Sequence, residues 1–394
     1  MSISTLGRVP AAMAASAVLF SVSSRADDPF DHIRPGFELN VPSLATIYGR
    51  LAMGYLKLPD EPCQAATCND PNKPNRGSRT RSYLGFRATE TLSGGLAAHF
   101  LLERSLFPGY GTASGDPVDS NKPWEVPAGP SFSGGSVVGL SSRSWGRVDL
   151  GRRDQPAWKV ALAADPWADS SVASPGSRLY LPVNESATRS PNSLTYSSPT
   201  GHPWGFELQR GRDRSEQRTE LGGSLRYASG AWFAAIGWQR WSDDAYALPL
   251  ALTWDAGSFK AYAGITRGRN PSAADYTSLF AGATMPLMSK GDPLRTEWRF
   301  GLASYNPSAG PGDVKFGAGW RYRFSPRTFV RVDAALVQNG DGKRSHGVEV
   351  GFVHSFERNL HIPAAREAPR FPRDPRNAGD PNAPRELREL GDPL

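Results

Sequence analysis

The sequence predicts an all-β fold: a sixteen-stranded antiparallel transmembrane β-barrel with short periplasmic turns and long extracellular loops. The clearest evidence is the alternation between Val314 and Phe324, where Trp320 and Tyr322 share one parity with other apolar residues. Arg321 shares the opposite parity with lysine, arginine and glycine. Because successive side chains of a strand point to opposite faces, one face is apolar and the other basic. The pattern recurs along most of the chain, as expected for a wall between lipid and water.

The connecting segments alternate in length. Short connectors such as Ser93–Gly95 and Ala256–Ser258 consist of small residues that favour tight turns. Long polar segments such as 59–79 and 108–132 lie between them. This rhythm is typical of outer-membrane barrels, which carry short turns on one side and long loops on the other. Strands are therefore expected at 45–58, 80–92, 96–107, 134–143, 147–153, 189–198, 204–211, 219–228, 231–242, 245–256, 258–268, 276–287, 295–305, 313–324, 327–338 and 346–356.

A helical membrane protein is not expected. The mean hydropathy is −0.44 and 39% of the residues are hydrophobic, whereas a spanning helix needs an apolar run of about 20 residues. The only candidate run follows Arg8 and ends in Ser24-Arg25-Ala26, with small residues at the −3 and −1 positions. This pattern predicts a signal peptide over residues 1–26, cleaved after Ala26. Residues 27–44 are expected to form an irregular lead-in to the barrel.

The composition changes after Phe356. Residues 357–394 contain seven prolines, seven arginines and seven acidic residues, with few large apolar side chains. Such a segment cannot bury enough surface to fold, so we expect a barrel over 45–356 and a disordered Pro/Arg-rich tail over 357–394. An even number of strands returns the chain to the side where it entered, which places the tail in the periplasm. A tether to a periplasmic partner is the alternative role for it.

The chain has two cysteines, Cys63 and Cys68, on the first long loop. A zinc site would lack half of its ligands, and in an exported chain the default expectation is a local disulfide between them. Free thiols are the alternative. No metal and no cofactor are expected.

The net charge of +7 does not indicate nucleic acid, because the arginines are spread along strands rather than clustered in a patch. The segment between the signal peptide and Glu357 is basic by five charges. An enzyme is not expected either: the sequence has no G-x-S-x-G elbow, and its six histidines are scattered.

Five short motifs resemble the general bacterial porins of Gram-negative outer membranes, of the β-proteobacterial type. They are T-I-Y-G-R-L at 46–51, Y-L-G-F-R-A-T-E-T-L-S-G-G-L at 83–96, V-D-L-G-R-R at 148–153, R-S-P-N-S-L-T-Y-S-S-P at 189–199 and G-V-E-V-G-F-V-H-S-F at 347–356. The resemblance implies a water-filled barrel in the outer membrane, usually a homotrimer. Its partners would be membrane lipid, lipopolysaccharide, and the small hydrophilic solutes and ions that pass through it.

The resemblance also implies a constriction, formed where the loop at about 154–190 folds into the lumen. Acidic residues on that loop, here Asp165 and Asp169, would face a ladder of basic wall residues. By motif the ladder is Arg50, Arg87, Arg152 and Arg189, and Arg81 is added because it shares the parity of Arg87.

Two of the departures from the family pattern concern the wall and its end. Arg152 has the parity of Val148 and Leu150, which read as lipid-facing, so a bend or bulge is needed to bring it inward. The family normally ends at the terminal aromatic of the last strand, whereas here Phe356 is followed by 38 further residues.

The predicted function is passive diffusion of small hydrophilic solutes and ions, with a weak preference for anions because the barrel is basic. A substrate-specific outer-membrane channel for a small anionic or polar solute is the alternative. Flux that saturates with one solute would favour the specific channel, and linear flux across many solutes the general one.

Overall fold

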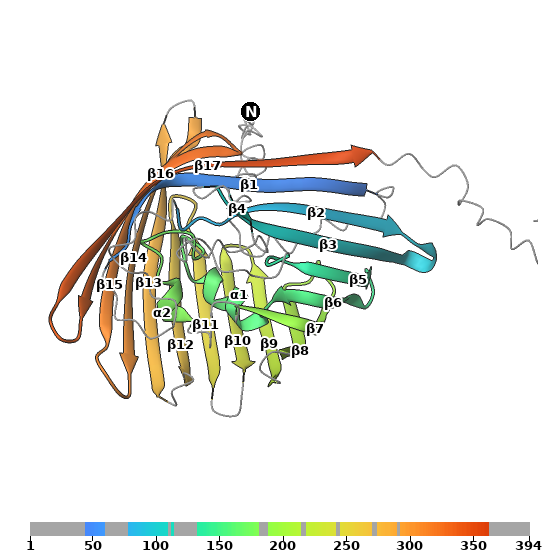
Figure 1. Ribbon diagram of the computed structural model, residues 1–394, viewed down its shortest axis with the longest axis horizontal. Helices are drawn as coiled ribbons and strands as arrows, with labels where there is room; N and C mark the ends of the chain where they lie inside the picture. The colour runs from blue at the N-terminus through green and yellow to red at the C-terminus, as the bar shows by residue number, and fades with distance from the viewer. Residues whose placement is uncertain are drawn as a thin grey trace, which may run out of the picture.

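The computed structural model of this protein is a closed antiparallel β-barrel (Figure 1). It describes residues 44–59, 78–108, 112–113, 132–180, 188–213, 218–241, 245–269, 274–289 and 292–361. Within these residues, each strand of the ring pairs with its neighbours in the chain, and β1 (Leu44–Lys57) pairs with β17 (Arg344–His361) to close it. The ring has sixteen strands, which confirms the predicted fold class.

The other strands of the ring follow in sequence order. They are β2 (Ser82–Thr91), β3 (Leu96–Phe107), β5 (Ser136–Ser142), β6 (Gly146–Asp154), β7 (Arg189–Ser197), β8 (Trp204–Asp213), β9 (Arg218–Ser229), β10 (Trp232–Arg240), β11 (Tyr246–Asp255), β12 (Lys260–Arg269), β13 (Asp275–Ser289), β14 (Asp292–Pro307), β15 (Asp313–Ser325) and β16 (Thr328–Asn339). A two-residue strand, β4 (Thr112–Ala113), pairs only with the end of β3. The described helical segments are η1 (Ser93–Gly95), α1 (Pro156–Ala163) and α2 (Gly176–Leu179). No helix in the described part of the chain is long and apolar enough to cross a membrane.

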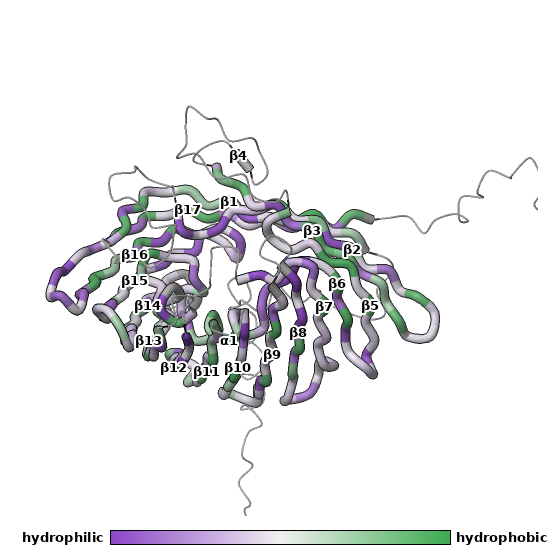
Figure 2. The backbone as a smooth tube through the Cα atoms, turned by 60° about the horizontal axis from the view of Figure 1, so that its bottom comes forward, coloured by the Kyte–Doolittle hydropathy of each residue, from purple (hydrophilic) through white to green (hydrophobic). Residues whose placement is uncertain are grey.

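The two faces of the wall differ in chemistry, and polar and apolar residues alternate along the strands (Figure 2). In β15, Phe316 and Phe324 are 46% and 57% exposed on the outer face, whereas Lys315 and Arg321 are buried on the inner face. Exposed apolar side chains on the outside of a barrel suit contact with lipid, and a polar inner face suits water. The alternation therefore has the predicted orientation, with the apolar side chains on the outer face of the wall and the basic side chains on the inner face.

One end of the barrel carries the short turns. Gly230 and Gly257 in these turns have φ angles of 55° and 80°, a conformation that side chains with a Cβ avoid. Beside them Trp232 and Trp254 stack with their ring centroids 5.8 Å apart. Aromatic rings at strand ends are typical of the girdle that marks a membrane interface.

The last strand differs from its expected length. β17 was expected to end at Phe356 but continues to His361, because Glu357–His361 pair with Leu44–Tyr48 of β1. The first residues of the expected tail therefore belong to the barrel wall. The rest of that tail, the signal peptide, most of the lead-in and the Cys63–Cys68 pair lie outside the described residues.

Candidate pore constriction

The segment that follows β6 turns into the barrel, and α1 lies inside the ring of strands (Figure 2). The helix begins after Gln155 with Pro156 in its first turn, where the missing N–H of proline costs no helical hydrogen bond. Ala157 and Val160 of this helix form one apolar cluster with small wall residues such as Ala251. Short side chains on both partners allow the helix and the wall to approach closely.

Glycines on the inner wall make room for the rest of the loop. A Cβ on Gly237 would lie 2.8 Å from the Cα of Ala157, and a Cβ on Gly317 would lie 2.4 Å from the carbonyl oxygen of Ala173. Three glycines on β12, β14 and β17 would meet loop atoms at 2.8, 2.9 and 2.6 Å: Gly264, Gly301 and Gly347. The described part of the predicted constriction loop therefore follows the inner wall from β10 to β17.

Wall carboxylates hold the loop in place. The indole N–H of Trp167 donates to Asp333 Oδ1 at 3.0 Å, and the backbone N–H of Val172 donates to Glu349 Oε2 at 3.0 Å. Further along, Arg178 Nε donates to Asp313 Oδ1 at 2.6 Å. These contacts tie lumen-facing carboxylates of β15, β16 and β17 to the loop.

Lys159 of α1 forms an ion pair with Glu207 of β8, and both side chains are largely shielded from water. Burial lowers the pKa of Lys159 to about 8, because removing water disfavours the charged ammonium, and Glu207 opposes that effect. Lys159 therefore carries a charge at neutral pH that a moderate rise in pH removes.

Asp165 does not face the arginine ladder as expected. Its carboxylate accepts hydrogen bonds from the backbone N–H groups of Trp167 and Asp169, both at 2.8 Å, and from the hydroxyl of Ser174. Burial raises the pKa of the Asp165 carboxyl above its ordinary value. The side chain is 4% exposed and shapes the turn of the loop from within.

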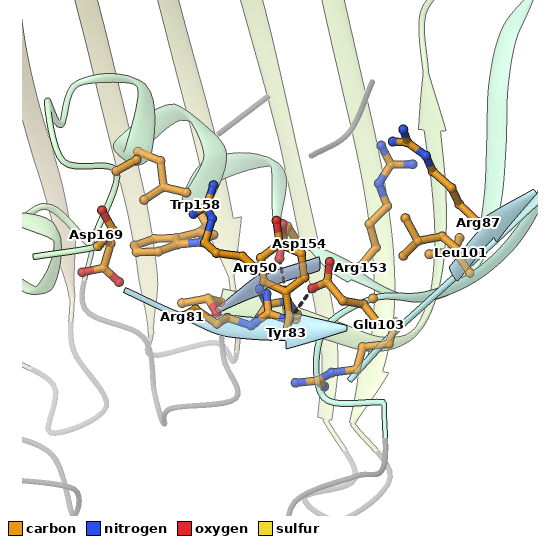
Figure 3. A pocket seen from close by; sticks show the side chains of 18 of the residues that line it. Arg50, Arg81, Tyr83, Arg87, Leu101, Glu103, Arg153, Asp154, Trp158 and Asp169 are labelled. Carbon is orange, nitrogen blue, oxygen red and sulfur yellow. Dashed lines mark hydrogen bonds and ion pairs between the residues drawn. The ribbon is translucent and has the colours of Figure 1, made fainter. Parts of the chain in front are cut away.

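A cavity of about 340 Å³ lies between this loop and the wall formed by β1, β2, β3, β5 and β6 (Figure 3). Three carboxylates line it: Glu103, Asp154 and Asp169. Eight arginines line it: Arg50, Arg79, Arg81, Arg87, Arg147, Arg152, Arg153 and Arg189. The five arginines predicted for the ladder thus line one cavity. In Figure 3, Asp169 of the loop lies at the left and Arg87 at the right.

Tyr83 stands between two of these arginines. The guanidinium carbons of Arg50 and Arg81 lie 5.7 and 5.3 Å from the centroid of its ring, a distance suited to cation–π attraction. Arg81 also pairs with Glu103, which accepts a hydrogen bond from the hydroxyl of Tyr48 at 3.2 Å. The side chains at this part of the wall are therefore held in fixed positions before any solute enters.

Arg152 reaches the cavity because β6 contains a bulge, as the outward parity of this residue required. The pairing of β6 with β7 shifts register between Gly151 and Arg153, and Gly151 has a φ of 131°. A bulge inserts an extra residue and changes the face to which the following side chains point. As a result Arg152 lines the cavity beside Arg153, and Arg152 Nε donates to the carbonyl oxygen of Ser133 at 3.3 Å.

Arg189 and Asp169 differ in how tightly they are paired. Arg189 Nε lies 2.7 Å from Asp154 Oδ1, which ties the start of β7 to the end of β6. Asp169 approaches Arg79 at 3.9 Å, and both side chains keep about a third of their surface exposed. The looser pair is the one that joins the constriction loop to the segment before β2.

Three arginines of the cavity were not among the sequence-predicted residues: Arg79, Arg147 and Arg153. Arg79 shares the parity of Arg81, so extending the alternation by one step would have found it. Arg147 and Arg153 both contact Asp149, a buried carboxylate that also lies 2.6 Å from His99 Nε2. Parity opposite to Val148 and Leu150 would have found both Arg147 and Arg153, whereas Arg152 needs the bulge to reach the same cavity.

A closed barrel with an apolar exterior and a charged interior narrowed by an inserted loop is the architecture of outer-membrane channel proteins. Comparison of the chain with models of known protein families identifies one such family. The model of the Gram-negative porin family matches residues 11–343, and the chain belongs to that family. This confirms the resemblance seen in the sequence and the location in the outer membrane.

A curated relative agrees with this assignment, and two solved structures share the fold. An outer membrane porin protein of Bordetella pertussis is 35% identical over 91 residues, which is 23% of this chain and 20% of that protein. The chain thus aligns with about a fifth of that relative's length. The anion-selective porin from Comamonas acidovorans has a TM-score of 0.63 and 20% identity, covering 80% of this chain and all 100% of that one. A loop L8 deletion mutant of OmpT from Vibrio cholerae has a TM-score of 0.60 and 12% identity, with 80% and 100% covered.

Proposed function

We propose that this chain forms a water-filled channel for passive diffusion of small hydrophilic solutes and ions, with a weak preference for anions. The observation that carries the proposal is the charge of the cavity beside the loop, which eight arginines and three carboxylates line. In a narrow space with low-dielectric walls, such an excess acts more strongly on a passing ion than it would in bulk water.

The preference is expected to be modest because much of the arginine charge is compensated. Arg81 pairs with Glu103, Arg189 with Asp154, and Arg147 with the buried Asp149. The remaining field is screened over about 8 Å at physiological ionic strength, so the preference should fade in concentrated salt.

Reversal potentials in a salt gradient across a planar bilayer test the proposal. The wild-type channel should favour chloride over potassium in dilute KCl, and Arg50→Ala and Arg87→Ala should each reduce that preference with little effect on assembly. Arg210→Gln is a matched control, since Arg210 is exposed on the outer face of β8. A clear cation preference of the wild-type channel would overturn the proposal.

The dense arginine lining also supports a second candidate, a channel specific for one small anionic solute. A cavity that offers several guanidinium groups can hold a carboxylate or phosphate by paired hydrogen bonds. Uptake into proteoliposomes separates the two: flux of many solutes should rise linearly with concentration in a general channel, whereas flux of the preferred anion should saturate in a specific one.

We further propose that the protein acts as a homotrimer among membrane lipid and lipopolysaccharide and that it has no catalytic role. The trimer rests on the family resemblance. The family and the fold are those of channel proteins, which supports the absence of catalysis. Native mass spectrometry in detergent would test the trimer, because a monomeric barrel would appear at one third of the expected mass.

A further inference from the structure

The part of β17 beyond Phe356 keeps the inner face of the barrel polar. In β17 the lumen-facing side chains occupy every second position, including Glu349 and Val353, and this parity continues to Glu357. Tyr48 of β1 is the register partner of Glu357, and Tyr48 in turn lies opposite Gly85 of β2. The first residue after the terminal aromatic therefore projects toward the lumen, two strands away from β2.

The Glu357 carboxylate reaches across β1 to an arginine of the cavity. Glu357 Oε1 lies 2.5 Å from Arg87 Nη2, and the guanidinium carbon of Arg87 lies 5.2 Å from the centroid of the Tyr48 ring between them. The side chains of Arg87 and Glu357 remain 28% and 46% exposed, so the pair faces the water of the lumen. Two residue pairs further along, the hydroxyl of Thr46 donates to Asn359 Oδ1 at 3.1 Å, which fixes the extension to β1.

We infer that Glu357 is a selectivity-determining residue: its carboxylate offsets the charge of Arg87 and weakens the anion preference of the channel. The inference rests on the proposed function, because it assigns a residue to the selectivity of that same cavity. It gives the extension of β17 a role, since a chain that ended at Phe356 would leave Arg87 without this carboxylate.

The expected size follows from Coulomb's law if the charge is taken to lie about 8 Å from the path of an ion. A unit charge about 8 Å from the path of an ion in water changes the local concentration of that ion about twofold in dilute salt. Because the chloride concentration rises and the potassium concentration falls by this factor, removing the Glu357 charge should raise the chloride-to-potassium permeability ratio about fourfold in dilute salt. The difference should vanish at about 1 M KCl, where the screening length is only about 3 Å.

The test compares single-channel reversal potentials of the full-length wild-type protein, Glu357→Gln and Glu90→Gln in dilute and in concentrated KCl. Glutamine keeps the size of the side chain and one acceptor oxygen, and it removes the charge. Glu90 is the matched control, because it lies near the same end of the barrel but has outward parity on β2 and is exposed. A chain truncated after Phe356 provides a second variant, and it should shift in the same direction as Glu357→Gln.

The expected result is a rise in anion preference for Glu357→Gln, no change for Glu90→Gln, and equal values for all variants in concentrated salt. An unchanged or lowered anion preference in Glu357→Gln, from a channel of normal conductance, would overturn the inference while leaving the proposed function intact. A wild-type protein without anion preference would instead contradict the proposed function. If the truncated chain fails to assemble, the reversal potential of Glu357→Gln alone still tests the inference.

Discussion

Replacing Glu349 by glutamine should loosen the loop that narrows the lumen. The Glu349 carboxylate is fully buried and joins three parts of the protein. Its Oε1 accepts hydrogen bonds from the hydroxyl of Ser78 at 2.7 Å and the backbone N–H of Arg79 at 2.9 Å, and it pairs with Arg331. Its Oε2 accepts the backbone N–H of Val172 in the constriction loop at 3.0 Å.

The magnitude follows from these contacts. An amide has one oxygen, so if it stays with Ser78 and Arg79, its NH₂ group faces the N–H of Val172, donor against donor. A hydrogen bond to a charged group contributes about 1.5–3 kcal/mol, so the equilibrium of loop docking at Val172 should shift about tenfold to a hundredfold. Arg331 also loses a charged partner. Breaking a buried ion pair costs about 3–5 kcal/mol, and we expect the lower value, about 3 kcal/mol of barrel stability, because Asp333 remains 3.5 Å from Arg331.

Single-channel recording and thermal denaturation measure the two consequences. Glu349→Gln should show higher open-channel noise, larger conductance and a lower denaturation midpoint. Glu297→Gln is the matched control: Glu297 also pairs with wall arginines, Arg299 and Arg321, but all of its hydrogen-bond partners given by the structure belong to the wall. It removes the same lumen charge without touching the loop. Equal noise and conductance in the two variants would refute the view that Glu349 anchors the loop.

Three further outcomes are expected. Gly317→Leu should displace the loop and change conductance, since even a Cβ would lie 2.4 Å from a loop carbonyl oxygen. Gly351→Ala should not, because its Cβ would meet the side chain of Arg331, at 3.3 Å, and no loop atom. Because the pKa of Lys159 is about 8, raising the pH from 7 to about 9.5 should remove one positive charge from the loop and lower the anion preference measured as a reversal potential. In Lys159→Arg the side chain stays protonated, so the reversal potential should change less with pH. Mass spectrometry of non-reduced peptides should find Cys63 joined to Cys68, and two alkylatable thiols would be the contrary result.

Strand faces and strand number were predictable from the sequence. The alternation in β15, with Trp320 outward and Arg321 inward, depends on the two-residue period of a strand and on the contrast between lipid and water. Both are local properties, so they are visible without knowing which strands are neighbours. The glycine-containing turns and the cavity positions of Arg50 and Arg87 follow from the same alternation together with the family motifs.

Other features depended on contacts between residues far apart in the sequence. The bulge in β6 that turns Arg152 inward arises from its pairing with β7, and Asp165 is buried because the loop folds on itself. The extension of β17 past Phe356 exists because β1 offers unpaired backbone groups to Glu357 and the residues that follow. Parity states which face a side chain takes, but only the closed barrel decides which strands stand beside each other. Ion pairs and loop anchors therefore became visible in the tertiary structure alone, because their energies depend on distances across the lumen.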